Sequence, residues 1–252
     1  MSLAVIKMCR YMPASEPETL VLLHGFAGTR RTWDGVVAAL DPQRYLPLAL
    51  DLRGHGSEHS RRPIDFTACV SDVLTAAPER FALCGYSLGG RVALHVALAD
   101  PGRINRLVLI GTNPGIEDPA ERARRLADDE LLAEAIESEP IEVFAERWRA
   151  QPLFAGDPAE VGALARADHA RNDPSDLAAA LRGLSAGAMD PIWDRLGELT
   201  MPTLVLAGER DEKYRALAER TANMIPGARA AVLPGGHAPQ LEEPLALTVA
   251  LS

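Results

Sequence analysis

A serine lies between glycines in the segment Gly85-Tyr86-Ser87-Leu88-Gly89, which has the pattern G-x-S-x-G. The apolar run Phe81–Cys84 precedes it, and apolar residues at helical spacing, from Leu88 to Ala99, follow it. This context is typical of a sharp strand-to-helix turn that projects a reactive hydroxyl. The glycines are needed because such a turn crowds the backbone around the serine. The pattern therefore predicts that Ser87 is the reactive hydroxyl.

A serine hydroxyl reacts readily only when a neighbouring imidazole takes its proton, so the chemistry requires a histidine. Gly235-Gly236-His237, after the last apolar run, supplies one. The alternatives to His237 are His24, His55, His59, His95 and His169. His24 and His55 lie in tight glycine-containing loops, where a histidine most often braces the backbone.

The imidazole in turn needs a carboxylate that fixes its tautomer and stabilises its positive charge. Asp211, in Gly208-Glu209-Arg210-Asp211, follows the apolar run Thr203–Ala207 and is the predicted partner. Glu209 is the competing carboxylate, and a cap of the loop is the structural alternative for Asp211. The chain order Ser, Asp, His is the one expected when a G-x-S-x-G turn carries the serine.

Two backbone amides are candidates for an oxyanion hole. The loop Leu23-His24-Gly25-Phe26 follows an early apolar run, and Leu88 follows the reactive serine. We expect the N–H groups of Phe26 and Leu88 to be the donors. The loop Asp51–Gly56 has a similar glycine-rich composition, but we expect a structural role for it.

Short apolar runs without polar alternation recur along the chain, as is typical of parallel strands covered on both faces by helices. We expect strands at Thr19–Leu23, Leu46–Leu50, Phe81–Cys84, Leu107–Ile110, Thr203–Ala207 and Ala230–Leu233. Leu3–Tyr11 could add an antiparallel edge strand. The fold class predicted is α/β, with a mostly parallel central sheet.

The alternation of strand and helix breaks between Asn113 and about Leu196, where helical stretches such as Pro119–Asp129 and Ile141–Ala150 follow one another. We interpret residues 113–196 as a helical cap inserted into an α/β core made of residues 1–112 and 197–252.

The chain has 252 residues, 47% of them hydrophobic, and a formal net charge of −9. This charge argues against a nucleic-acid partner, although clustered arginines could still bind a small anion. Cys9, Cys69 and Cys84 have no metal-ligand spacing, so we predict no metal and no cofactor. The odd number of cysteines and the absence of a secretory pattern favour the cytoplasm, and no apolar run suggests membrane insertion. The sequence leaves the oligomeric state open.

With these motifs in place, the chain resembles the bacterial 2-succinyl-6-hydroxy-2,4-cyclohexadiene-1-carboxylate synthases of menaquinone biosynthesis. The resemblance runs nearly end to end, and Ser-Leu-Gly-Gly-Arg and Gly-Glu-x-Asp-x-Lys are its narrowest motifs. It is carried by Leu22–Phe26, Gly85–Arg91, Trp148–Phe154, Trp193–Leu196 and Gly208–Tyr214. It implies an α/β-hydrolase fold and a lyase that eliminates pyruvate from 2-succinyl-5-enolpyruvyl-6-hydroxy-3-cyclohexene-1-carboxylate without consuming water.

The resemblance also implies roles for particular residues. Ser87 would act as the base and relay the proton to His237, while the oxyanion hole holds an enolate. The small substrate carries several carboxylates, which arginine binds well. The residues implied to contact the substrate are Arg91, Arg125, Trp148 and Tyr86. The chain departs from the family at His169, where an arginine is common; Arg166 and Arg171 lie close by in the sequence.

Two other functions remain open at this point. The same triad would serve a carboxylesterase or thioesterase, in which Ser87 forms a covalent acyl intermediate. A burst of product from an activated ester would favour that reading. A catalytically silent ligand receptor could also use this scaffold, and ligand binding without turnover would identify it.

Overall fold

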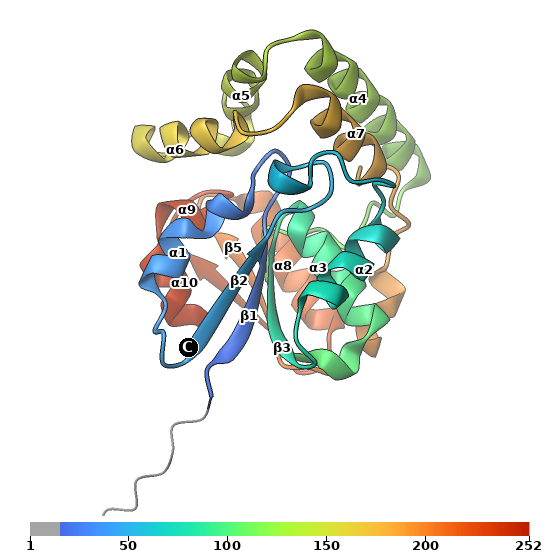
Figure 1. Ribbon diagram of the computed structural model, residues 1–252. Helices are drawn as coiled ribbons and strands as arrows, with labels where there is room; N and C mark the ends of the chain where they lie inside the picture. Colours follow the sequence, from blue (N-terminus) through green and yellow to red (C-terminus); the bar gives the residue numbers. More distant parts are fainter. Residues whose placement is uncertain (1–15, 252) are drawn as a thin grey trace, which may run out of the picture.

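The computed structural model describes residues 16–251, and a six-stranded sheet crosses the middle of the molecule (Figure 1). All six strands pair in parallel, in the order β2-β1-β3-β4-β5-β6. Each predicted strand is confirmed, while the expected edge strand at Leu3–Tyr11 lies outside the described residues. The strands are β1 (Glu18–Leu23), β2 (Tyr45–Leu50), β3 (Phe81–Tyr86), β4 (Ile104–Ile110), β5 (Thr203–Gly208) and β6 (Arg229–Leu233).

Helices cover both faces of the sheet, as the near-continuous hydrophobicity of the strands requires. Successive residues of one strand point to opposite faces: Val21 and Leu23 pack towards α2, α3 and α8, whereas Leu20 and Leu22 pack towards α1 and α10. No helix within the described residues has the length and apolar character to cross a membrane. The helices that cover the sheet are α1 (Asp34–Ala39), α2 (Phe66–Ala76), α3 (Leu88–Ala99), α8 (Glu212–Met224), α9 (Pro239–Glu242) and α10 (Pro244–Leu251).

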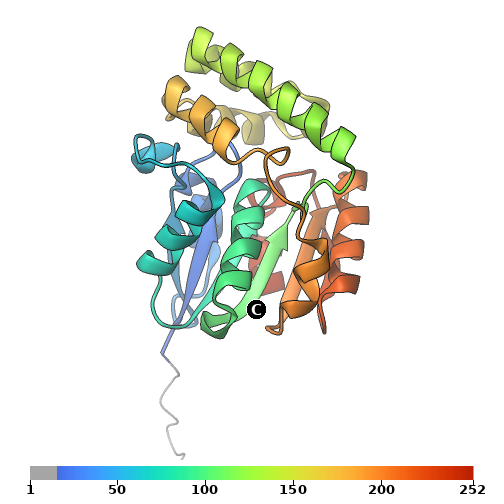
Figure 2. The ribbon, with the colours of Figure 1, turned by 90° about the vertical axis from the view of Figure 1, so that its right-hand side faces the viewer.

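Four further helices form a layer above the carboxyl edge of the sheet, as the side view shows (Figure 2). They are α4 (Pro119–Ser138), α5 (Ile141–Arg149), α6 (Ala159–His169) and α7 (Pro174–Gly183). Asp118 and Asp173 begin α4 and α7 by accepting bonds from backbone amides of the first turn, and a proline follows each cap. α4 runs nine residues past the predicted stretch, because Ala133 and Ile136 bury its second half against α7.

The last residues of segment 113–196, which the sequence predicts to be a cap, pack with the core rather than with α4, α5, α6 or α7. Trp193 and Leu196, in the short helix η5 (Trp193–Glu198), are buried in the cluster that contains β4, β5 and α8. The Trp193 indole N–H donates to the Gly115 carbonyl at 2.8 Å, so both ends of the segment are held together. The remaining short helices are η1 (Arg30–Trp33), η2 (Gly56–Glu58), η3 (Pro101–Arg103) and η4 (Pro152–Phe154).

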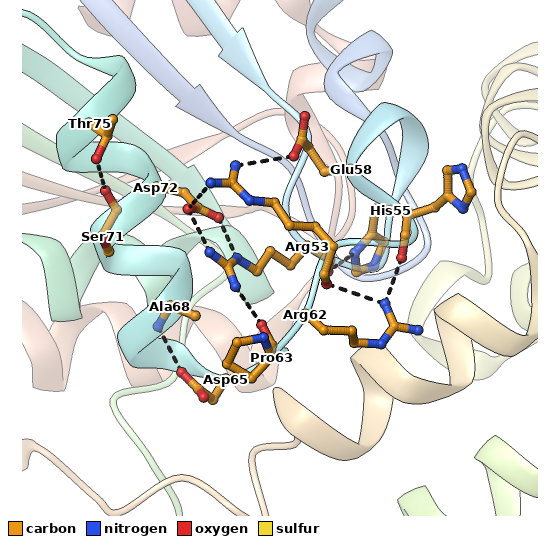
Figure 3. Close-up of polar contacts among 12 residues, drawn as sticks. Arg53, His55, Glu58, Arg62, Pro63, Asp65, Ala68, Ser71, Asp72 and Thr75 are labelled. Carbon is orange, nitrogen blue, oxygen red and sulfur yellow. Dashed lines mark hydrogen bonds and ion pairs between the residues drawn. The ribbon is translucent and has the colours of Figure 1, made fainter.

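The loop after β2 is held by buried polar contacts. The Arg53 guanidinium donates to both carboxylate oxygens of Asp72 on α2, at 2.5 and 2.8 Å, and to the Pro63 carbonyl (Figure 3). Arg61 reaches the same Asp72 carboxylate at 3.0 Å. Bidentate pairing of this kind fixes a loop in one geometry. The contacts agree with the structural role that we expected for this segment.

His24 and His55 brace the backbone, as the sequence indicated. His24 Nε2 accepts from Leu52 N at 3.0 Å, and His55 Nε2 accepts from Ala27 N at 3.3 Å. Both imidazoles are fully buried, and burial lowers the pKa of His55 to about 3. Neither ring is therefore the histidine that serves Ser87.

Candidate active site

Ser87 occupies a strained turn between the end of β3 and the start of α3. Its φ of 51° lies in the left-handed region, which L residues rarely adopt. A Cβ added to Gly85 would lie 2.3 Å from Gly89 O, and one added to Gly89 would lie 2.3 Å from Leu23 O. Ser87 N donates to Ile110 O on β4 at 2.8 Å, which anchors the turn to the neighbouring strand. The glycines thus permit the approach that projects the serine.

The imidazole of His237 lies between Ser87 and Asp211. Its Nδ1 is 2.6 Å from Asp211 Oδ2, and its Nε2 is 3.4 Å from Ser87 Oγ. Asp211 also begins α8, where its other carboxylate oxygen accepts from Tyr214 N at 3.3 Å. The competing carboxylate, Glu209, is exposed. Because β3, β5 and β6 are parallel, the loops after them meet at one edge of the sheet and bring the three groups together.

Aromatic rings enclose His237 and leave its exposed fraction at 2%. Its ring centroid lies 4.5 Å from that of Tyr214, 5.4 Å from that of Tyr86 and 6.1 Å from that of Phe154. Pairing with a carboxylate places the proton on Nδ1, which leaves the Nε2 lone pair directed at Ser87. The site can therefore accept a proton from the serine hydroxyl.

The two residues expected to supply the oxyanion donors lie in segments that border Ser87. Leu88 is the first residue of α3, so its N–H has no acceptor within the helix. The loop after β1 passes close to the serine, because a Cβ added to Gly25 would lie 3.4 Å from Ser87 Cβ. Phe26 follows in this loop and lines the same cavity as Ser87. Anion binding by these amides stays a prediction.

A cavity of about 480 Å³ opens above Ser87 and His237, beneath α4 and α5. Most of its charged side chains come from the segment Glu121–Asp129 of α4. Its cationic lining residues are Arg91, Arg124, Arg125 and Lys213, and its acidic ones are Glu121, Asp128 and Asp129. A small anion could therefore bind here despite the net negative charge of the chain.

The two arginines predicted to contact substrate differ in their surroundings. Arg125 is partly exposed, and its Nε donates to Asp129 Oδ2 at 2.8 Å. Arg91 lies one turn after Ser87, and its buried Nε has no hydrogen-bond partner among the described residues. Burial and the charge of Arg125 lower the pKa of Arg91 to about 10, so it is a cation near neutral pH. A carboxylate would satisfy this group most directly.

Trp148 and Tyr86, the other predicted contacts, lie in different positions. Trp148 lines the Ser87 cavity, with its ring 5.1 Å from Phe26 and 5.7 Å from Phe144. Tyr86 is buried against Gly25 and His237 and lines a second cavity instead. Its ring lies 5.4 Å from the imidazole of His237, and its expected contact with the substrate stays a prediction.

Some residues of the Ser87 cavity were not expected from the sequence. The residues at and near position 169 lie outside this cavity. Arg124 and Lys213 were missed, although they lie within Pro119–Asp129 and Gly208–Tyr214, two segments named in the sequence analysis. His169, Arg166 and Arg171 are not among the described residues that line the Ser87 cavity. His169 is buried at the end of α6 and lines the second cavity, so no direct substitute for the family's arginine faces Ser87 from this segment.

Comparisons with known proteins agree with this fold. The family model described as "Alpha/beta hydrolase family" matches residues 20–251. A 2-succinyl-6-hydroxy-2,4-cyclohexadiene-1-carboxylate synthase of Klebsiella pneumoniae is 37% identical over 210 residues, 81% of this chain and 81% of the relative. The solved structure of MenH from S. aureus has a TM-score of 0.86 at 31% identity and covers 93% of this chain and 91% of that one. A thermophilic esterase of Thermogutta terrifontis is also similar, with a TM-score of 0.78 at 26% identity, over 93% of this chain and 88% of the esterase.

Proposed function

The chain belongs to the α/β hydrolase family and, within it, to the 2-succinyl-6-hydroxy-2,4-cyclohexadiene-1-carboxylate synthases, and on this premise we propose how its residues act. It is a lyase of menaquinone biosynthesis that eliminates pyruvate from 2-succinyl-5-enolpyruvyl-6-hydroxy-3-cyclohexene-1-carboxylate. Ser87, His237 and Asp211 are its catalytic residues. The observation that supports the proposal best is the chain of contacts from Asp211 through His237 to Ser87. Ser87 and His237 line a cavity that also contains cationic side chains.

The elimination begins with the removal of a proton from the carbon beside the succinyl ketone. Ser87 Oγ takes this proton as its own passes to His237 Nε2, and Asp211 stabilises the imidazolium. The 3.4 Å between Oγ and Nε2 is longer than a proton-transfer distance and would shorten when substrate binds. The N–H groups of Phe26 and Leu88 stabilise the enolate oxygen.

The enolate then collapses to the ketone. Its electron pair moves through the ring double bond and breaks the bond between the ring carbon and the enolpyruvyl oxygen. The departing enolate of pyruvate takes up a proton at its CH2 carbon while the His237 imidazolium gives one up, so pyruvate leaves, the triad is restored and no water is consumed. In this mechanism Ser87 moves a proton and forms no covalent bond to the substrate.

Binding of the substrate depends on its carboxylates. Arg91 supplies an unpaired guanidinium next to Ser87, and Arg125 supplies a second from α4. Trp148 packs against the apolar ring of the substrate. Residues 113–196 would act as a cap that brings Arg125 and Trp148 over the core. A cytoplasmic location and the absence of a nucleic-acid partner stay predictions from the sequence.

Direct measurement of pyruvate release tests this function. The wild-type protein should release one pyruvate per molecule of the enolpyruvyl substrate, measured with lactate dehydrogenase and NADH. Ser87→Ala should lose about a thousandfold or more in kcat, because proton transfer by a positioned group contributes on this scale. Ser71→Ala, on the exposed side of α2, makes the same chemical change away from the site and should keep full activity. No pyruvate from the wild-type protein would refute the proposal.

Intact-protein mass spectrometry separates the lyase from an esterase with the same triad. Rapidly quenched reactions should contain no added mass on Ser87, and substrate deuterated beside the ketone should react more slowly. An adduct that forms and decays at the turnover rate would instead support acyl transfer.

A further inference from the structure

A second cavity, of about 240 Å³, lies beside the Ser87 cavity. Phe26 and Trp148 line both, so their side chains separate the two spaces. The second cavity is bounded by η1, by the C-terminal half of α6 and by α9. Figure 1 shows α6 lying above α1 and α9, away from the helix pair α4 and α7. None of the groups assigned to proton transfer lines it.

Three polar side chains from three different helices line this cavity, and some of their buried atoms have no hydrogen-bond partner in the part of the chain that the structure describes. They are Nε of Arg149 on α5, Nδ1 of His169 at the end of α6, and both amide atoms of Gln240 on α9. The exposed fraction is 1% for Gln240 and 7% for His169, and 5% for the Arg149 side chain. Buried polar groups in folded proteins are almost always paired, so their convergence on one cavity indicates a missing ligand.

The charges around the cavity restrict what that ligand can be. Arg149 pairs through its NH2 group with Asp157, and its guanidinium stacks 4.0 Å above the Phe154 ring, so its plane is fixed. Asp168, which also lines the cavity, already accepts from Thr29 N at 2.9 Å and from Thr32 Oγ1 at 3.0 Å. The Nε–H of Arg149, which has no partner among the described residues, is therefore a donor that requires an acceptor.

The other arginines that line the cavity each face a carboxylate. Arg31 lies 3.7 Å from Asp34, and Arg171 lies 3.9 Å from Asp168, so these pairs add little net charge. Burial lowers the pKa of His169 to about 4, so its ring is neutral near pH 7 and contributes a polar atom but no charge. The Gln240 amide adds an N–H donor that is fixed by burial. Two unpartnered donors that line one cavity, one of them on a guanidinium, suit the two oxygens of a carboxylate.

We propose that the second cavity is a carboxylate subsite in which Arg149 Nε–H and the Gln240 amide N–H donate to the same carboxylate group. The inference rests on the proposed function for the source of that carboxylate. It is either a carboxylate of the bound substrate, which reaches past Trp148, or the free 2-oxo acid that the reaction releases. The apolar side chains of Phe154 and Leu241 would then contact the carbon atoms next to it.

Calorimetric binding measurements distinguish the two sources without turnover. Sodium pyruvate is the probe for protein that keeps Ser87. The enolpyruvyl substrate is the probe for protein that carries Ser87→Ala. Gln240→Leu removes the amide at nearly constant volume, and Arg149→Lys keeps a cation beside Asp157 but removes the Nε–H. Gln43→Leu makes the same change as Gln240→Leu on the exposed loop before β2 and serves as the control.

If the subsite holds the free acid, pyruvate should bind, Gln240→Leu and Arg149→Lys should each weaken its binding by about tenfold or more, and the control Gln43→Leu should not. If it holds a carboxylate of the substrate, the same two changes should weaken substrate binding to Ser87→Ala protein by a similar factor. The proposal is overturned if both variants fold, as judged by thermal unfolding, and neither changes the binding of either probe. A wild-type protein that releases no pyruvate would defeat the proposed function, while pyruvate binding would still test the subsite.

Discussion

At the scale of single residues, the site is defined by which polar groups have partners and which do not. His237 is fixed by Asp211 on one side and surrounded by three aromatic rings, so its free nitrogen can only face Ser87. Arg91 is half-buried nearby, and its buried Nε has no partner among the described residues, whereas Arg125 already pairs with Asp129. In the proposed mechanism, proton transfer and carboxylate binding depend on different residues of this cavity, which single substitutions can separate.

Ser87 and His237 should behave as one proton-transfer unit. Ser87→Ala and His237→Ala should each remove most of kcat, and the double variant should be about as slow as the slower single variant. Steady-state pyruvate release measures all three rates, and circular dichroism checks that each variant is folded. A double variant that shows the product of the two single losses would mean that the residues act independently.

Arg91→Ala should affect carboxylated substrates selectively. The lost contact is between a desolvated guanidinium and a carboxylate, so kcat/KM for the enolpyruvyl substrate should fall by about 10- to 100-fold. Turnover of a neutral activated ester by the same variant should change little. Equal losses on both substrates would instead assign Arg91 a structural role on α3.

At the scale of elements, the turn between β3 and α3 depends on close backbone approach. Gly89 lies against the end of β1, and α3 can pack there only because residue 89 has no Cβ. The same approach brings the loop that contains Phe26 beside Ser87. The helix packing and the expected oxyanion hole therefore depend on one contact between α3 and β1.

Gly89→Ala should destabilise the fold and inactivate the enzyme, because its Cβ would lie 2.3 Å from Leu23 O and 2.5 Å from His24 O. Backbone atoms cannot move away as a flexible side chain can, and we expect a loss of at least ~3 kcal/mol in the free energy of unfolding. Gly197→Ala is the matched control, since a Cβ there meets nothing within 4 Å. Urea unfolding measures both, and a normal stability for Gly89→Ala would show that α3 can shift.

At the scale of the whole molecule, buried neutral histidines link the stability of the fold to pH. Burial lowers the pKa values of His24, His55 and His169, the last two to about 3 and about 4. In the unfolded chain these imidazoles titrate near 6.5. Between the two values the unfolded chain binds more protons than the folded one, so stability rises with pH in this range.

The free energy of unfolding should therefore fall as the pH is lowered below about 6.5. Each such histidine contributes about 1.4 kcal/mol per pH unit until its folded-state pKa is reached. Urea unfolding at pH 7, 6 and 5 measures the slope. His55→Gln keeps polar atoms but cannot titrate, so its slope should be shallower. An unchanged slope in this variant would remove His55 as a source of the pH dependence.

The sequence by itself determined the strands, the helix after Ser87 and the candidate set Ser87, Asp211 and His237. These features depend on short-range signals: apolar runs, helical spacing and glycines at a turn are properties of neighbouring residues. They were enough to identify the family and its carboxylated substrate, because the narrow motifs lie in those same segments.

The tertiary structure alone decided which side chains meet. It selected Asp211 over the exposed Glu209, added Arg124 and Lys213 to the Ser87 cavity, and placed Tyr86 and His169 at a second cavity. The physical reason is distance along the chain, since Ser87 and His237 are 150 residues apart and meet only through the order of parallel strands. The lining of a cavity further depends on how helices pack across one another, and no local pattern records that packing.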